Sequence, residues 1–129
     1  MAKKKNADFL EALRWQEYNS SPVIAEKYPN VATLIIEMVL HDDSGIRVIN
    51  EETRDYPVSQ SKTIIRLKCP NYECVQGGFD LTRVVASVIE NKEQEREGRL
   101  VCQGWQDQER IGKYHCYTDL VYKIAVRYK

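Results

Sequence analysis

Four cysteines constrain this chain more than any other feature of its sequence. Cys69 and Cys74 are separated by four residues, whereas Cys102 and Cys116 fall on two segments that alternate like neighbouring strands. Four thiols are the number that a tetrahedral zinc site needs. The sequence shows no apolar export signal, so we expect the thiols to stay reduced, which favours metal binding over disulfides.

The length and charge of the chain limit its fold and its partners. The 129 residues predict one α+β domain over 1–129, with a helical segment over 1–30 and a sheet, a helix and the cysteines over 31–129. Lys plus Arg and Asp plus Glu both number 19, so the whole molecule has no net charge to attract a polyanion. Glu37 interrupts the longest apolar stretch, and we therefore expect no membrane span and a cytoplasmic protein.

The N-terminal segment predicts two short helices. Residues 8–18 are rich in helix-forming types, and Phe9, Ala12 and Leu13 are spaced to share one side of an amphipathic helix. A second helix is predicted over residues 21–28, with Ser21 as its cap and a proline at its first position.

The middle of the chain begins with a predicted strand. Residues 31–41 form a nearly continuous apolar run that favours a buried strand, although the length also permits a helix. A turn is predicted at 42–45, and residues 46–49 are compatible with a short paired strand. Residues 50–61 are polar and contain Pro57, so we expect a long surface loop there.

A strand and a helix are predicted to follow. Residues 63–69 alternate, with Ile65, Leu67 and Cys69 on the inward side. After a turn at Gly77-Gly78, Asp80 is expected to cap a helix that runs to about residue 97. Its apolar stripe comprises Leu81, Val84, Val85, Val88 and Ile89.

The C-terminal part predicts a β-hairpin from residues 99–106 and 114–128. A hairpin that closes symmetrically around Glu109 would place Cys102 opposite Cys116, with both thiols on the core side. The strand before Cys69 delivers this residue from its own core side, and the four intervening residues allow Cys74 to turn back toward it. The four thiols are therefore expected to meet.

A pair of cysteines from a loop and a pair from a hairpin resembles a zinc ribbon, with Cys69, Cys74, Cys102 and Cys116 as ligands of a structural zinc ion. Zinc ribbons commonly use two Cys-x2-Cys pairs, whereas thirteen residues separate the second pair here, so the resemblance covers only the cysteine-bearing segments. Two alternatives remain open. The cysteines are either unligated core residues, or they form one or two disulfides.

The outer face of the predicted hairpin combines aromatic and cationic residues, a pattern that single-strand binders use. Its members are Trp105, Lys113, His115, Tyr117, Lys123 and Arg127. A face packed beneath the N-terminal helices or against a protein partner explains the same residues. The neutral total charge favours packing or a protein partner over nucleic acid.

The residue types that catalysis would need are not gathered in any persuasive motif. His41 precedes Asp42 and Asp43, but these three neighbours in the chain lead into a predicted turn. We therefore expect a small non-enzymatic binding or adaptor module with a zinc site. RNA or single-stranded DNA binding is the first alternative, and a thiol- or metal-dependent enzyme is the second.

Overall fold

The computed structural model describes residues 12–42, 46–70, 74–75, 77–102, 104–108, 112–116 and 118–129. A helix over residues 12–20, here called the N-terminal helix, precedes the labelled elements. In chain order these are α2 (Ile24–Lys27), β1 (Val31–His41), β2 (Val48–Asp55), β3 (Arg66–Leu67), β4 (Cys74–Val75), β5 (Phe79–Asp80), α3 (Thr82–Glu90), β6 (Glu95–Val101), β7 (Trp105–Gln108), β8 (Gly112–His115) and β9 (Asp119–Tyr128).

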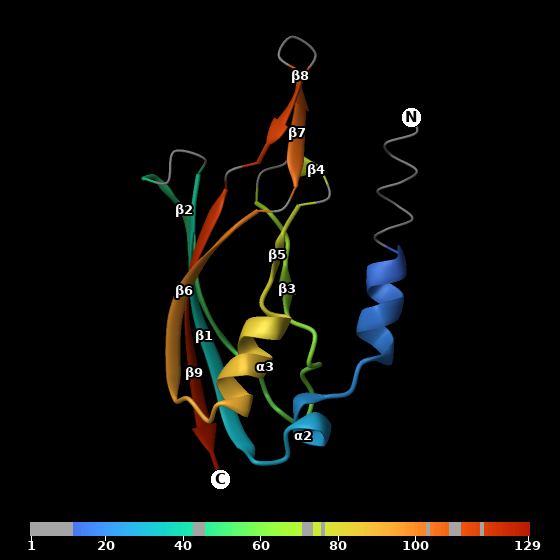
Figure 1. Cartoon of the computed structure of the whole chain (residues 1–129), viewed down its shortest axis with the longest axis vertical. Helices are drawn as coiled ribbons and strands as arrows, with labels where there is room; N and C mark the ends of the chain where they lie inside the picture. Colours follow the sequence, from blue (N-terminus) through green and yellow to red (C-terminus); the bar gives the residue numbers. More distant parts are fainter. Residues whose placement is uncertain are drawn as a thin grey trace.

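The main sheet has four antiparallel strands in the order β2-β1-β9-β6. The two long central strands pair along most of their length, for example Ile36 with Ile124 and Leu40 with Leu120. Helix α3 lies across one face of this sheet, as Figure 1 shows. The predicted α+β class with a mainly antiparallel sheet is therefore confirmed.

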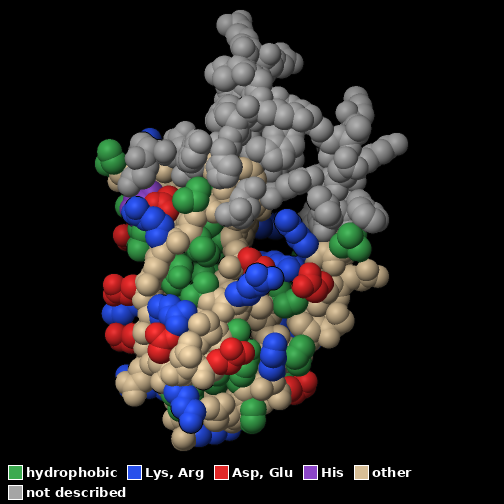
Figure 2. All heavy atoms as spheres, viewed as in Figure 1, with side chains coloured by type: hydrophobic (Ala, Val, Ile, Leu, Met, Phe, Trp, Pro, Cys, Tyr) green, Lys and Arg blue, Asp and Glu red, His purple; other side chains and the backbone are tan. Residues whose placement is uncertain are grey.

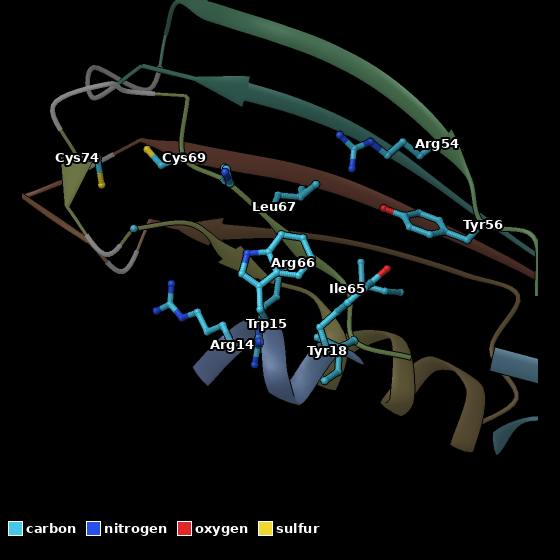
Figure 3. A pocket seen from close by; sticks show the side chains of 13 residues that line it. Arg14, Trp15, Tyr18, Arg54, Tyr56, Ile65, Arg66, Leu67, Cys69 and Cys74 are labelled. Carbon is cyan, nitrogen blue, oxygen red and sulfur yellow. The ribbon is translucent and has the colours of Figure 1, made fainter. Parts of the chain in front are cut away.

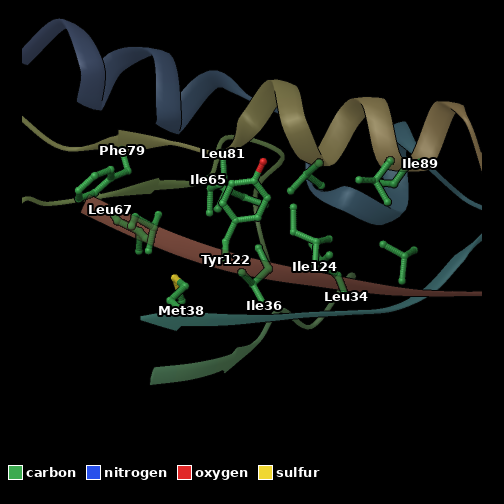
Figure 4. Packing of buried hydrophobic residues seen from close by; sticks show 14 of the residues in the cluster. Leu34, Ile36, Met38, Ile65, Leu67, Phe79, Leu81, Ile89, Tyr122 and Ile124 are labelled. Atoms are coloured by element: carbon green, nitrogen blue, oxygen red, sulfur yellow. The ribbon is translucent and has the colours of Figure 1, made fainter. Parts of the chain in front are cut away.

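The hydrophobic core lies between this face of the sheet and the segments that cover it (Figure 4). Alternate residues of both central strands point inward, because successive side chains of a strand leave opposite faces. Those of β1 and β9 are almost fully buried: Leu34, Ile36, Met38, Leu120, Tyr122, Ile124 and Val126. From the covering segments, Ile65, Phe79, Leu81 and the buried residues of α3 pack against them.

Two small sheets extend from this body. Strands β3 and β5 form a two-stranded sheet, and β4, β7 and β8 form a three-stranded sheet in the order β4-β7-β8. Figure 1 shows β7 and β8 projecting beyond one end of the main sheet. The segments on which the cysteines were expected therefore belong to different sheets, which meet at this end.

Two sequence predictions agree closely with the structure. Strand β1 spans Val31–His41, the predicted range. Helix α3 buries Val85, Val88 and Ile89, and Leu81 just before it is fully buried, so the predicted apolar stripe faces the core. The first carries a nearly continuous apolar run and the second an apolar stripe with the helical period, and both signals are visible in the sequence.

The predicted loop over residues 50–61 is wrong over its first half. Residues Val48–Asp55 form β2, which pairs with β1 from Ile35↔Asp55 to His41↔Val48. This strand lies at the edge of the sheet, and most of its residues are exposed on both sides. An edge strand need not alternate in hydrophobicity, so its polar sequence resembles that of a loop.

The predicted extension of the third helix to about residue 97 is also wrong. Helix α3 ends at Glu90, and Lys92 takes a positive φ of 54°. Residues Glu95–Val101 then form the other edge strand, β6, in which exposed and half-buried residues alternate. The charged residues expected at the end of the helix therefore lie on an edge strand.

The N-terminal prediction needs two corrections. Helix α2 has only four residues, Ile24–Lys27, and Ser21 does not cap it, because its hydroxyl donates to the Tyr18 carbonyl oxygen at 2.6 Å. The N-terminal helix continues to residue 20, and its described residues are all exposed, including Leu13. Phe9 lies outside the described residues.

The predicted register of the C-terminal hairpin is wrong by one position. Leu100 pairs with Leu120 and Trp105 pairs with His115, which centres the hairpin on residue 110 instead of 109. The Cys102 N–H accordingly donates to Thr118, and the Cys116 N–H donates to Gly104. The two cysteines are diagonal neighbours on one side, which preserves their predicted proximity.

Candidate metal centre

The four cysteines come together where the small sheets meet the main sheet. Cys69 lies two residues after β3, and Cys74 is the first residue of β4. Cys102 follows β6 directly, and Cys116 follows β8 directly. Their Sγ atoms all lie within 4.8 Å of one another, and no other such group of metal-binding side chains occurs in the described part of the chain. The predicted clustering of these four residues is confirmed.

Two of the sulfur–sulfur distances are close to what a tetrahedral ion needs. Zinc–thiolate bonds of about 2.3 Å give a tetrahedron whose sulfur–sulfur edges are about 3.8 Å. The Sγ atoms of Cys69 and Cys116 are 3.8 Å apart, and those of Cys74 and Cys102 are 3.5 Å apart. None of the four cysteines forms a disulfide, so the described geometry is compatible with a metal site and does not contain the alternative disulfides.

The site is partly enclosed by the protein. Cys102 and Cys116 are fully buried and belong to the hydrophobic core, whereas Cys69 and Cys74 are half-buried at its edge. Two sulfurs are therefore shielded from solvent, while the other two leave one side for an ion to enter.

Hydrogen bonds favour the thiolate form of Cys102. The Gly78 N–H donates to its Sγ at 3.2 Å, and the Gly104 N–H donates at 3.4 Å. The neighbouring Cys69 thiol and these two backbone donors lower the pKa of Cys102 to about 5, although burial opposes the shift. Burial, followed by the hydrogen bond with Cys102 and then the Cys102 charge, raises the pKa of Cys74 to about 12. One thiolate is therefore favoured by the protein alone, and further deprotonation calls for a cation.

Two glycines provide the space that the sulfurs occupy. A Cβ on Gly77 would lie 2.5 Å from the Cys102 Sγ and closer still to the Cys74 Sγ. A Cβ on Gly104 would lie 2.5 Å from the Cys74 Sγ. The sequence predicts Gly77 only as part of a turn, and it carries no prediction for Gly104. The signal was the short spacing from Cys74 to Gly77 and from Cys102 to Gly104.

Gly78 has a second role beside the site. Its φ of +138° lies in a region that other residues rarely adopt, and an added Cβ would be 2.5 Å from the Leu67 carbonyl oxygen. This backbone conformation directs the Gly78 N–H toward Cys102. The glycine pair is thus a turn, as predicted, and it also supports the thiol cluster.

The six residues expected on one outer face are divided between two sheets. Lys123 and Arg127 lie on β9, in the main sheet. The backbone of three others lies in the small sheet, namely Trp105, Lys113 and His115. Tyr117 lies outside the described residues.

Acidic residues flank the basic side of the main sheet. Lys123 pairs across the strands with Glu37 on one side and Glu97 on the other. Since directly opposed residues share a face, two carboxylates border this ammonium group. The main-sheet part of the expected face therefore offers little net positive charge.

None of the helices in the described ranges is both long and apolar enough to span a membrane. No protein-family model matches this chain, and neither a curated protein nor a solved structure shows significant similarity to it.

Proposed function

We propose that this chain is a small non-enzymatic binding module in which Cys69, Cys74, Cys102 and Cys116 hold a structural zinc ion. The observation that carries the proposal is the approach of four Sγ atoms to within 4.8 Å of one another. Four soft thiolates suit zinc. The d-electrons of zinc impose no geometry of their own, and structural zinc sites are almost always four-coordinate and tetrahedral. Iron is the other metal that binds tetrahedral thiolate sets, and the experiment below distinguishes the two.

A structural role is favoured over a catalytic role. Catalytic zinc sites keep one position for water or substrate, and they usually have three protein ligands. Four cysteines would fill all the positions of a tetrahedral ion here. The alternative of a metal-dependent enzyme therefore lacks the open coordination position that it needs.

The location of the cluster indicates what the ion would stabilise. Strand β4 pairs with β7 through only two residue pairs, Cys74↔Gln106 and Val75↔Trp105. Such a short ladder is weak by itself, because isolated two- and three-stranded units need a hydrophobic face or other support. An ion shared by Cys74 and Cys102 would fasten this small sheet to the main sheet.

Nucleic-acid binding by the hairpin face remains a weaker hypothesis. The expected face is split between two sheets, and carboxylates border Lys123. A protein partner suits the exposed face of the main sheet better, because it mixes charges of both signs with half-exposed apolar residues such as Ile35 and Val101.

The zinc proposal is tested by the metal content of the purified full-length chain. The masses of the chain measured under native and under denaturing conditions should differ by the mass of one zinc ion. The absorption spectrum should lack the visible bands of an iron–thiolate site. Cys102→Ser should lose the ion, because a neutral hydroxyl replaces a thiolate. Ser87→Ala, in α3, is a control that changes no cysteine and should keep the ion.

Two results would contradict the proposal. Absence of any tightly bound metal after expression in zinc-supplemented medium would favour the alternative of unligated core thiols. Full metal retention by Cys102→Ser and by Cys116→Ser would show that the ion binds elsewhere.

A further inference from the structure

A cleft of 590 Å³ lies between the N-terminal helix and β3 (Figure 3). Trp15 and Tyr18 of the helix form one wall, and Arg54 and Tyr56 approach from the opposite side. Cys69 and Cys74 lie at one end of it. This volume is typical of pockets that bind small molecules.

Cationic side chains line the cleft. Four cationic residues line it and no acidic residue among those described does so; the four are Arg14, Arg54, Arg66 and Lys68. Figure 2 shows basic side chains beside a hollow on this face, with acidic side chains next to them. A nearly neutral chain thus concentrates positive charge at one concave place, where low-dielectric walls strengthen the field.

Two of these cations are already neutralised by nearby carboxylates. The guanidinium of Arg66 forms ion pairs with Glu17 at 3.0 Å and with Asp80 at 3.3 Å. Arg54 forms an ion pair with Glu52. These pairs fix the two arginine side chains as part of the wall.

The other two cations have no such partner within the described part of the chain. Neither Arg14 nor Lys68 forms an ion pair with any other described residue. Four cations and the three carboxylates that pair with them leave one positive charge among the described residues at the cleft, which suits an anionic group of a ligand.

The aromatic residues of the cleft provide a surface for a planar ring. Trp15 remains 55% exposed, and it packs edge-on against Tyr18 with ring centroids 5.8 Å apart at 87°. This pair orients the indole while leaving more than half of Trp15 open. An exposed indole beside cations is the arrangement that stacks nucleobases and holds their phosphates.

Tyr56 adds an unsatisfied polar group on the opposite wall. Its hydroxyl is buried and finds no hydrogen-bond partner of ordinary geometry among the described residues, although Arg54 lies nearby. Figure 3 shows this hydroxyl pointing toward the middle of the cleft. A buried hydroxyl without a partner costs free energy that a polar ligand atom would recover.

We propose that this cleft binds a nucleotide unit, with the base stacked on Trp15 and the phosphate held by Arg14 and Lys68. The proposal names a ligand for the binding module proposed above, and it rests on side chains other than the four thiols. A second cavity of 320 Å³ shares Arg54, Arg66 and Lys68 with the first, so a longer strand has room to continue beyond one unit.

The test measures binding of a fluorescein-labelled single-stranded hexanucleotide to the metal-loaded full-length chain at 50 mM salt. We expect binding that weakens with rising salt, because each phosphate contact releases counterions. Trp15→Ala should weaken it about 5- to 150-fold, the equivalent of 1–3 kcal/mol of stacking. Arg14→Gln and Lys68→Gln should each lower the salt dependence, whereas Lys27→Gln, a matched control outside the cleft, should not.

Competition experiments separate the sources of the ligand. Displacement of the hexanucleotide by adenosine monophosphate supports a free nucleotide as ligand, whereas binding of the oligonucleotide without such displacement supports a strand. Adenosine and inorganic phosphate should each compete less well than the monophosphate. Equal competition by inorganic phosphate alone would overturn the proposal, because the aromatic wall would then contribute nothing.

Other outcomes would also overturn the proposal. One is a lack of oligonucleotide binding at low salt. Another is unchanged binding by the Trp15→Ala variant together with weaker binding by the Lys123→Gln variant, which would locate the ligand on the main sheet. Metal content and thermal unfolding are measured for every variant. A variant that keeps its ion and its melting temperature but loses binding tests the cleft alone, separately from the zinc proposal.

Discussion

Substitution of Gly77 by alanine is the sharpest test of the thiol geometry, because it changes no cysteine. The added Cβ would lie 2.5 Å from the Cys102 Sγ, whereas ordinary contact begins at 3.4 Å. Cys102 would have to move by about 0.9 Å, the difference between these two distances, and Cys74 by more. Metal sites tolerate deviations of only about 0.2 Å in their bond lengths.

The displacement predicts a large loss of zinc affinity. Changes around metal ligands typically cost about 10- to 100-fold in affinity, and we expect Gly77→Ala to reach the upper end of this range. At saturating zinc a 100-fold loss corresponds to about 2.7 kcal/mol of unfolding free energy. For a chain of this length, that lowers the melting temperature by roughly 10 °C.

The assay is a competition titration with a chromophoric zinc chelator, combined with thermal unfolding with and without chelator. Gly98→Ala is the matched control, because its Cβ would meet the Tyr122 hydroxyl instead of a thiol. It is expected to lower stability equally with and without zinc and to leave zinc affinity unchanged. If Gly77→Ala bound zinc as tightly as the unaltered chain, our reasoning that both sulfurs coordinate one ion would be refuted.

Two further predictions concern the stability of the fold. Val85→Asp should destabilise the protein by about 3 kcal/mol or more in urea unfolding, because it buries an unpaired carboxylate, while the half-exposed Val84→Asp should cost less. Asp80→Ala should cost about 0.5–2 kcal/mol at pH 7, because the Asp80 carboxylate accepts a hydrogen bond from the Thr82 N–H at 2.9 Å at the start of α3. Burial raises the pKa of Asp80, but hydrogen bonds from Thr82 and the Arg66 charge outweigh it and lower that pKa. The difference between Asp80→Ala and the unaltered chain should therefore persist above pH 4 and vanish as the pH falls through this lowered pKa, which unfolding curves at several pH values would check.

The central part of the fold was predictable because its residues are buried on a regular period. Strand β1 and the apolar stripe of α3 both present one continuous inward face. The alternation that ends with Ile124 and Val126 likewise identified β9. Buried faces of this kind record their geometry directly in the sequence.

The edges of the sheet were not predictable for the converse reason. Strands β2 and β6 are largely exposed, so hydrogen bonds to their neighbours fix them and no hydrophobic pattern reveals them. The register error at Glu109 does not come from the break between Val101 and Trp105, because the ladders on both sides of this break are centred on residue 110. Moving the centre by one residue changes the partner of each residue by two positions, so each side chain stays on its predicted side of the sheet.

The cleft was missed because its walls come from distant parts of the chain. Trp15 belongs to a helix whose sequence indicates only an amphipathic face, and Tyr56 follows a strand whose polar sequence resembles that of a loop. The sequence therefore predicts the aromatic and cationic pattern on the hairpin, where the residues are close in sequence. The same residue types gather around Trp15 only through the tertiary fold.

The position of the cysteines suggests how the metal site and the cleft depend on one another. Cys69 and Cys74 line one end of the cleft, and Lys68, proposed to hold the phosphate, directly precedes Cys69. An ion that fixes Cys69 would also restrict the backbone of Lys68, and a bound phosphate would restrict the same segment. Since each ligand would then meet part of the ordering cost of the other, their binding free energies must be coupled with a favourable sign. The two proposals therefore predict that the nucleotide raises the affinity of the chain for zinc. Zinc should raise the affinity for the nucleotide by the same factor.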